Sequence, residues 1–293
     1  MFSNFFSSNT PSADDGSKPL IVITGISGYI GSQILNYCVS NLADSYRIRG
    51  TARNPNDYDK MEPLYSYMGG EEALLAKVEI VSADLQDNDS IDAAVAGATY
   101  VIHTSSPVGI NEPDDPNYYI LPAVEGTLSV MRAALKHGVK RVVMTSSIAA
   151  VETQSEETME SDPVLDETYW SELDSGQRIA AYSRSKTVAE KAAWDFLKEI
   201  PNGQPKPELV TILPGLVLGE FICGGISSSP ALIKSIIQNS LPGIPRIVFS
   251  AVDMDDVVQA HIKGLFTPEA AGERFIIVKQ NIWLVDICQM CQT

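Results

Sequence analysis

The sequence contains no long hydrophobic run: no window approaches the roughly 18 uninterrupted apolar residues that a membrane-spanning helix requires. Cysteine is also scarce, with four in 293 residues: Cys38, Cys223, Cys288 and Cys291. A chain of this size with so few cysteines is not held together by a disulfide framework, so the cytoplasm is the expected compartment.

Basic residues are outnumbered, with 21 lysines and arginines against 37 aspartates and glutamates, which gives a formal net charge of −16. Nucleic acids and anionic membrane surfaces repel such a charge, so neither is an expected partner, although a local basic pocket is compatible with it. Residues 1–18 lack the basic and hydrophobic parts of a signal peptide. Their Ser, Asn, Asp and Pro content predicts a disordered tail.

Cys288 and Cys291 form a CxxC motif, which has two chemical interpretations: redox activity, or one half of a zinc site. No second pair is present to complete four ligands, and no expected strand leads directly into the motif. We therefore expect neither function, and the sequence predicts no metal site.

Short apolar runs alternate along the chain with longer segments of helical periodicity. The expected strands are 20–24, 46–52, 78–82, 100–103, 141–145 and 209–213, and the expected helices are 30–43, 61–75, 90–96, 119–137 and 181–199. Such alternation predicts βαβ units with right-handed crossovers, and continuously apolar strands indicate a sheet buried on both faces. The predicted fold class is α/β, with a Rossmann-type doubly wound parallel sheet.

After about residue 218 the alternation of apolar runs and helical segments becomes irregular, and Gly, Ser and Pro become frequent. We expect a dinucleotide-binding Rossmann domain over 19–218, to which 245–265 returns, and a small C-terminal substrate lobe over 219–293. The lobe is expected beside the carboxyl edge of the sheet, where ligands of open α/β folds bind.

Three glycines, Gly25, Gly28 and Gly31, follow the first expected strand and open the next helix. Without Cβ atoms the chain can turn tightly and a ligand can approach the backbone. A helix N-terminus also presents unpaired N–H groups and a partial positive charge, which suit a pyrophosphate. The spacing is GxxGxxG rather than GxGxxG, and a purely structural turn is the alternative. We expect this turn, with Tyr29 and Ile30 at the start of the helix, to bind a dinucleotide.

An arginine, Arg53, follows the second strand, where an NAD site places an acidic residue. An acid there repels a 2′-phosphate, whereas a guanidinium binds it through charge-assisted hydrogen bonds. Arg49 is a possible substitute for Arg53, and Lys60 is expected within reach of the same anion. A solvated loop arginine is the alternative. The sequence favours NADP(H) over NAD(H).

Asp84 and Leu85 follow the third expected strand. At the carboxyl end of a strand, Asp84 can accept a hydrogen bond from the adenine amino group, and Leu85 can pack on the ring. The alternative is that Asp84 only begins the following turn.

Tyr182 and Lys186 lie four residues apart in an expected helix, hence on one face. An ammonium beside a phenol lowers the phenol pKa from about 10, so the tyrosine can deliver a proton to a carbonyl oxygen. Ser147 ends the strand before this helix, and its hydroxyl can donate to the same oxygen. The alternative for Ser146 and Ser147 is a helix cap or turn, and one of the pair can have that role alone.

Together these motifs resemble the extended short-chain dehydrogenase/reductases of the NAD-dependent epimerase/dehydratase superfamily, most closely the dihydroflavonol reductase-like branch of aldehyde and ketone reductases. The resemblance covers about residues 20 to 265 and rests on TGISGYIG, Arg53, ADL at 83–85, VIHTSSP at 101–107, RVVMTSS at 141–147, YSRSK at 182–186, LPGLVLG at 213–219 and VDMDDVVQAH at 252–261.

The resemblance implies that Ser147, Tyr182 and Lys186 are the catalytic triad and that Lys186 also binds the nicotinamide ribose. It implies further cofactor contacts in two groups: Thr104, Ser105 and Ser106 after the fourth strand, and Pro214, Gly215 and Val217 beside the nicotinamide. The histidines His103, His137 and His261 are then structural, and none is needed as a base. Family members usually run some tens of residues beyond the point where this sequence ends, so the substrate lobe is expected to be truncated or unusually small.

The expected function is NADPH-dependent, reversible reduction of an aldehyde or ketone to an alcohol, with Tyr182 as proton donor. Two alternatives are a nucleotide-sugar epimerase or dehydratase that retains NAD, which Arg53 disfavours, and a non-catalytic NADP-binding regulatory protein, which the presence of both Tyr182 and Lys186 disfavours. The partner is a small carbonyl or alcohol whose identity the sequence does not specify, because variable loops build its pocket. The expected assembly is a monomer or a homodimer.

Overall fold

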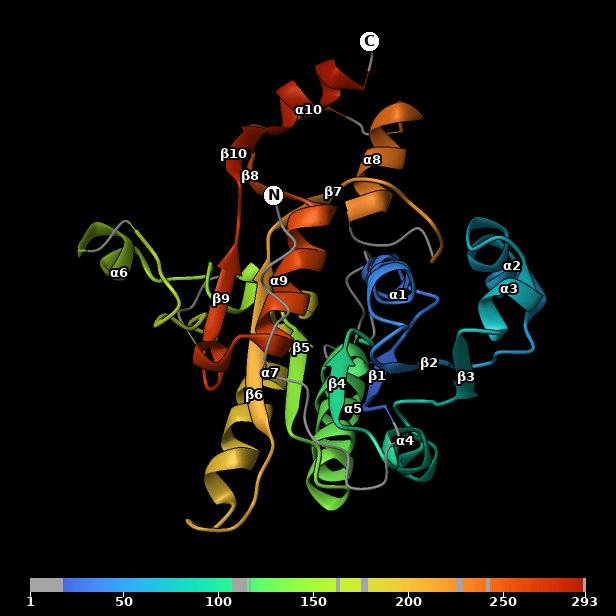
Figure 1. Cartoon of the computed structure of the whole chain (residues 1–293). Coiled ribbons are helices and arrows are strands. Elements are labelled where there is room, and N and C mark those ends of the chain that lie inside the picture. Colours follow the sequence, from blue (N-terminus) through green and yellow to red (C-terminus); the bar gives the residue numbers. More distant parts are fainter. Residues whose placement is uncertain are drawn as a thin grey trace.

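A seven-stranded parallel sheet forms the centre of the protein (Figure 1). The computed structural model describes residues 18–106, 115, 117–161, 164–174, 179–224, 229–240 and 243–291. The strand order is β3-β2-β1-β4-β5-β6-β9, and every neighbouring pair is parallel. The strands are β1 (Leu20–Thr24), β2 (Arg47–Ala52), β3 (Val78–Ser82), β4 (Tyr100–His103), β5 (Arg141–Thr145), β6 (Glu208–Pro214) and β9 (Arg274–Ile277). The predicted α/β, doubly wound fold class is confirmed.

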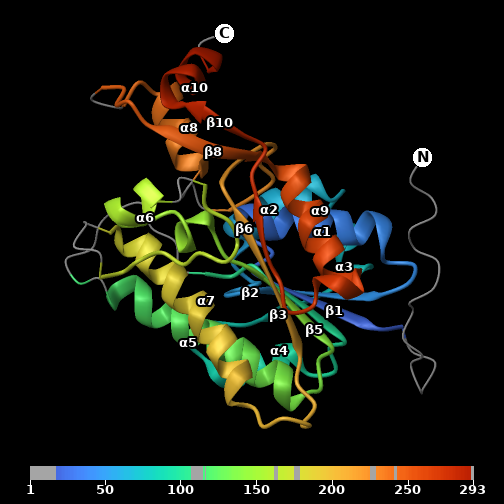
Figure 2. The same ribbon diagram turned by 90° about the vertical axis from the view of Figure 1, so that its left-hand side faces the viewer.

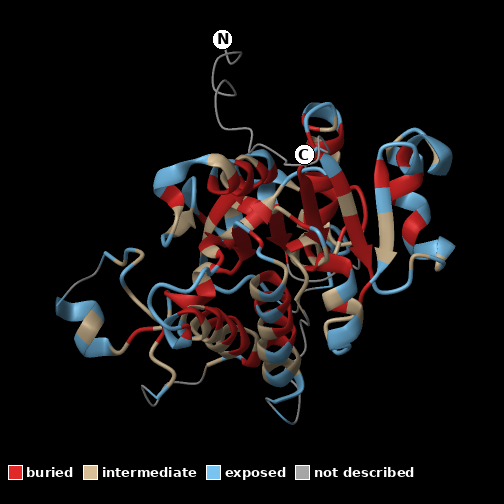
Figure 3. Cartoon of the chain, turned by 60° about the horizontal axis from the view of Figure 1, so that its bottom comes forward, coloured by how far each residue is buried: buried red, intermediate tan, exposed pale blue. Residues whose placement is uncertain are grey.

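Helices cover both faces of this sheet, as Figure 2 shows. Because successive side chains of a strand point to opposite faces, Ile21 and Ile23 of β1 pack on one side, and Leu20 and Val22 on the other. The first side is covered by α1 (Tyr29–Asn41) and α9 (Met254–Phe266), and the second by α4 (Asn88–Val95), α5 (Asn117–Lys136) and α7 (Ala181–Glu199). Buried residues follow the strands and the inner sides of these helices (Figure 3).

One expected helix, 61–75, is in fact two: α2 (Tyr58–Tyr67) and α3 (Glu71–Leu75). The break falls at Gly69 and Gly70, whose φ angles of +87° and +111° lie in a region that helical residues do not occupy. The sequence also did not predict β9, which pairs with β6 at the edge of the sheet.

A second, three-stranded sheet of order β10-β8-β7 lies above the main one in Figure 1, with two helices beside it. Its strands are β7 (Leu216–Leu218), β8 (Val248–Asp253) and β10 (Gln280–Trp283), and the helices are α8 (Ser229–Ile237) and α10 (Leu284–Met290). Ile282, Leu284, Ile287 and Cys288 form part of its own small core. The CxxC motif therefore lies on and just after α10, with Cys288 in that core.

The remaining short elements are η1 (Ile148–Ala150), α6 (Glu156–Ser161) and η2 (Pro268–Ala270). Within the described part of the chain, no helix is long and apolar enough to cross a membrane. The same residues contain no group of three or more His, Cys, Asp or Glu side chains arranged to hold a metal ion. A disordered tail was expected over residues 1–18, of which residues 1–17 lie outside the described residues.

Candidate active site

The carboxyl ends of the parallel strands meet at one edge of the main sheet. β1 ends at Thr24, β4 at His103, β5 at Thr145 and β6 at Pro214. Ligands of open α/β sheets bind outside these carboxyl ends. The residues that directly follow these strands therefore lie along one edge of the sheet, although they come from distant stretches of the chain.

The glycine turn joins β1 to α1, and two of its glycines are required by close packing. Gly25 has a φ of +75°, and a Cβ on it would lie 2.5 Å from the Oγ of Ser105. A Cβ on Gly31 would collide with the carbonyl oxygen of Gly25 and lie 2.8 Å from the Oγ1 of Thr104. Gly28 is the N-cap of α1 and provides no capping side chain. The first N–H groups of α1 thus meet the criteria for binding an anion at a helix N-terminus.

A segment that the sequence did not single out as a contact, residues 219–224, packs against this turn. The hydroxyl of Tyr29 donates to the carbonyl of Gly219 (3.2 Å), and the Gln33 side-chain amide donates to the carbonyl of Glu220 (2.9 Å). A Cβ at the last residue of the segment would lie 2.9 Å from the backbone nitrogen of Tyr29. These contacts link residues nearly two hundred positions apart, and no local motif signals them.

Arg53 extends into solvent beyond the end of β2, with 82% of its side chain exposed. Its Nε lies 3.6 Å from the Oδ2 of Asp84. The Oδ1 of Asp84 also accepts a hydrogen bond from the backbone N–H of Gln86 (3.0 Å), so Asp84 does begin the following turn. Leu85 packs against α5: a Cβ added to Gly126, which belongs to that helix, would lie only 2.8 Å from the Cβ of Leu85.

Arg49 is not available as a substitute for Arg53, so this expectation was wrong. Its Nε is 2.8 Å from Glu79, and its Nη1 donates to the carbonyls of Ala94 and Ala96 at the end of α4. Lys60 is largely exposed and pairs with Asp57 (2.7 Å) at the start of α2.

Thr104, Ser105 and Ser106 follow β4, and the first two lie beside the glycine turn. The Thr104 hydroxyl donates to the carbonyl of Thr24 (2.6 Å), and the backbone N–H of Ser105 donates to the Thr24 hydroxyl (3.2 Å). That hydroxyl also contacts the Nδ1 of His103 (2.9 Å). The ends of β1 and β4 are thereby held together.

Pro214, Gly215 and Val217 lie where the chain passes from the main sheet to the small one. The N–H of Gly215 donates to the carbonyl of Ile277 (3.2 Å), and a Cβ on it would collide with the backbone of Ser250. The N–H of Val217 donates to the Ser229 hydroxyl (3.2 Å). Both sheets therefore hold this crossing in place.

Tyr182 and Lys186 lie one turn apart on α7. The Lys186 side chain is buried, and its Nζ lies 5.9 Å from the centre of the Tyr182 ring. Burial lowers the pKa of Lys186 to about 8, and the carboxylate of Glu190 opposes this shift. A buried ammonium next to a phenol is the arrangement that favours the phenolate.

The two serines after β5 have different partners. Ser147 is the N-cap of η1, and its Oγ accepts a hydrogen bond from the N–H of Ala149 (3.2 Å). Ser146 donates instead to a buried carboxylate oxygen of Glu190 (2.5 Å). Because η1 packs against α7, Ser147 and Tyr182 come from adjacent elements.

Two of the histidines are buried and structural in their contacts. The Nε2 of His261 lies 2.6 Å from the Thr145 hydroxyl, and its Nδ1 lies 2.8 Å from the Val257 carbonyl, so Nδ1 carries the proton. Burial lowers the pKa of His261 to about 4 and that of His103 to about 3. His137 lies just after α5 and contacts Asp92 (3.1 Å).

The His261 environment predicts a loss of stability in acid. The unfolded chain binds a proton on this histidine from about pH 6.5 downward, whereas the folded protein does so only near pH 4. The free energy of unfolding should therefore fall as the pH drops from about 6.5 to 4. Urea unfolding of wild type and His261→Gln across this range checks it: the variant should be less stable at neutral pH but should lose less stability on acidification. Equal slopes would contradict the assignment.

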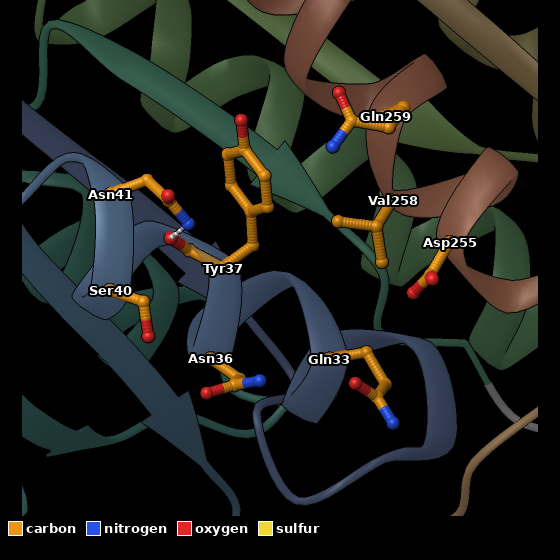
Figure 4. Close-up of a pocket in the computed structure, with 8 residues that line it drawn as sticks. All are labelled: Gln33, Asn36, Tyr37, Ser40, Asn41, Asp255, Val258 and Gln259. Atoms are coloured by element: carbon orange, nitrogen blue, oxygen red, sulfur yellow. Dashed lines mark hydrogen bonds between the residues drawn. The ribbon is translucent and has the colours of Figure 1, made fainter.

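A groove of about 120 Å³ lies between α1 and α9, and Figure 4 shows the side chains that line it. It is lined by polar side chains, among them Gln33, Asn36, Tyr37, Asp255 and Gln259. None of the expected cofactor or catalytic residues lines it, so we do not assign the cofactor to it.

Comparison with known proteins shows that residues 21–277 match the NAD dependent epimerase/dehydratase family. A dihydroflavonol 4-reductase from Hordeum vulgare is 33% identical over 95% of this chain and 75% of its own length. A cinnamoyl-CoA reductase from Arabidopsis thaliana is 35% identical over 88% of this chain and 70% of its own. Among solved structures, the yeast methylglyoxal/isovaleraldehyde reductase Gre2 complexed with NADPH matches with a TM-score of 0.75 and 26% identity, covering 91% of this chain and 80% of that one.

Proposed function

Because the chain belongs to the NAD dependent epimerase/dehydratase family, we propose that it is an NADPH-dependent oxidoreductase that reduces an aldehyde or ketone to an alcohol. The observation that carries the proposal is the placement of Tyr182 beside the buried ammonium of Lys186 on α7. The two plant relatives are reductases by name, and the yeast neighbour was solved with NADPH.

The residues present fit a dinucleotide. The glycine turn is closed to side chains by packing, and it opens α1 without a capping side chain. Exposed Arg53 offers a guanidinium to a 2′-phosphate at the end of β2, close to Asp84. The proposed cofactor contacts are Gly25, Gly28, Tyr29, Ile30, Gly31, Arg53, Lys60, Asp84, Leu85, Thr104, Ser105, Ser106, Tyr182, Lys186, Pro214, Gly215 and Val217.

When bound, NADPH supplies the hydride that reduces the carbonyl carbon. The proton comes from the protein: Tyr182 donates its hydroxyl proton to the carbonyl oxygen as negative charge develops there. The Ser147 hydroxyl donates a hydrogen bond to the same oxygen and stabilises that charge. Lys186 keeps its positive charge beside the phenolate that remains, which then regains a proton from solvent. Alcohol oxidation runs through the same groups in reverse.

A screen of carbonyl compounds, followed by the loss of NADPH absorbance and with NADH as the control, tests the proposal. Dihydroflavonols, methylglyoxal and isovaleraldehyde are the first compounds to try, because they carry an aldehyde or ketone carbonyl and appear in the names of the similar reductases. Turnover with NADPH on any of them supports the proposal. Tight NADPH binding without turnover on a broad panel would favour the non-catalytic alternative.

Arg53 provides a test of cofactor choice. Because the 2′-phosphate is the part of NADPH that Arg53 is proposed to bind, and NADH lacks it, Arg53→Gln should raise the KM for NADPH about tenfold or more while leaving the KM for NADH nearly unchanged. Steady-state kinetics with each cofactor measures this. Arg49→Gln is the matched control, since Arg49 binds Glu79 and the end of α4 and should not change the preference. Finding NAD retained by the purified protein would instead favour the epimerase or dehydratase alternative.

A further inference from the structure

A buried carboxylate, that of Glu190, lies behind the proposed catalytic residues. It is completely inaccessible to solvent and accepts hydrogen bonds from three elements of the main sheet. Ser146 after β5 donates at 2.5 Å, Thr211 of β6 at 2.8 Å and the Nε of Arg274 of β9 at 2.8 Å. Trp194, one turn further along α7, adds a longer contact of 3.3 Å. A carboxylate buried this completely requires such partners, because burying an unpaired charge is costly in free energy.

Arg274, the ionic partner of Glu190, is fixed from its other side. Its Nη1 donates to the carbonyls of Glu167 (2.6 Å) and Tyr169 (2.7 Å), and its guanidinium lies 3.6 Å from the centre of the Trp170 ring. Its side chain is only 9% exposed. The ion pair therefore ties α7 to the edge strand β9 through groups that have little freedom to move.

Glu190 is also connected to both elements that carry the proposed triad, namely α7 with Tyr182 and Lys186, and the end of β5 with Ser147. It follows Lys186 by one turn and Tyr182 by two, so the three side chains lie along one side of α7, where Lys186 and Glu190 are buried. Its partner Ser146 immediately precedes Ser147. One carboxylate thus joins the helix that carries the tyrosine and lysine to the strand end that carries the serine.

The charges around Lys186 make Glu190 relevant to its protonation. Burial disfavours the ammonium, whereas the Glu190 carboxylate favours it. Among the described residues, Tyr182 on the same helix and His103 of β4 also lie near Lys186, and burial keeps that histidine neutral at working pH. On the far side of the carboxylate, Arg274 is the opposing positive charge.

We propose that Glu190 is a positioning residue: held by Arg274, it fixes α7 against the end of β5 and keeps Lys186 protonated beside Tyr182. The expected effects on turnover rest on the proposed reductase function. The geometry of the Ser146–Glu190–Arg274 contacts is independent of the substrate.

Glu190→Gln tests the charge while keeping the shape of the side chain. Removing a negative charge favours loss of the first proton from the interacting Tyr182–Lys186 pair, whichever group releases it. Carbonyl reduction needs both protons, so the alkaline decline in kcat should move to lower pH by about one pH unit. The tyrosinate absorbance of Tyr182 should also move to lower pH without turnover, measured as the difference between each protein and its Tyr182→Phe version.

Two matched variants separate charge from packing. Arg274→Gln disturbs the same contacts but removes a positive charge, so the decline should move to higher pH. Glu190→Asp keeps the charge and should keep the wild-type decline. If Glu190→Gln and Arg274→Gln both lower kcat with an unmoved pH profile, Glu190 is only structural and the inference is wrong. If the wild type shows no turnover, the reductase proposal fails, while the absorbance titration still decides the role of Glu190.

Discussion

Tyr182→Phe is expected to lower kcat for carbonyl reduction by a factor of about 10² to 10⁴. Phenylalanine keeps the ring of Tyr182 and its contact with Lys186 but has no proton to donate. NADPH binding should change little, because the glycine turn, Arg53 and Lys186 remain in place. Steady-state kinetics with NADPH and a fluorescence titration of NADPH binding measure the two quantities.

Tyr37→Phe is the control for the loss of a tyrosine hydroxyl, since Tyr37 lines the groove between α1 and α9, and none of the proposed cofactor or catalytic residues lines that groove. It should retain full turnover. Undiminished turnover in Tyr182→Phe would contradict the proposal that Tyr182 donates the proton. Loss of both turnover and NADPH binding would point instead to collapse of the site.

Gly31→Ala is expected to have the second large effect, on both stability and cofactor binding. The new Cβ meets the carbonyl oxygen of Gly25, which is backbone, and the Thr104 hydroxyl at 2.8 Å. The turn must open to admit it, at a cost of about 1–3 kcal/mol in the free energy of unfolding. Because the same turn is proposed to hold the pyrophosphate, each ~1.4 kcal/mol of binding lost raises the Kd for NADPH tenfold.

Chemical denaturation and NADPH titration of Gly31→Ala measure the two effects. Gly243→Ala is the matched control, because nothing lies within 4 Å of a Cβ at that position. It should leave both quantities close to those of the wild type. Wild-type NADPH affinity in a folded Gly31→Ala protein would contradict the placement of the pyrophosphate at this turn.

The six strands expected from the sequence all form, with ends shifted by one residue at most. They were readable because a parallel sheet buried on both faces requires continuous apolar runs such as that of Leu20–Thr24. β7, β9 and β10 are only three or four residues long and mostly less buried, so their sequences carry little of this signal. The helix break at Gly69 and Gly70 was equally hidden, since a glycine pair is compatible with either outcome until its backbone angles are known.

The candidate site also contains features that the sequence predicts and contacts that it does not. Local spacing was enough to single out the glycine turn, Arg53 and the Tyr182–Lys186 pair, because each depends on residues a few positions apart on one turn or one helix. The partners of Arg49 could not be read, because Glu79 becomes its neighbour only when β2 and β3 pair.

By itself, therefore, the amino-acid sequence determined six of the seven strands of the main sheet, the fold class and the family of this protein. Apolar periodicity and short motifs act over a few residues and can be read directly. Tertiary structure alone decided that segment 219–224 packs against the glycine turn and that Arg274 meets Glu190, a residue 84 positions away. The physical reason is that such contacts depend on which strands lie side by side and in what register, and those are properties of the whole packed sheet.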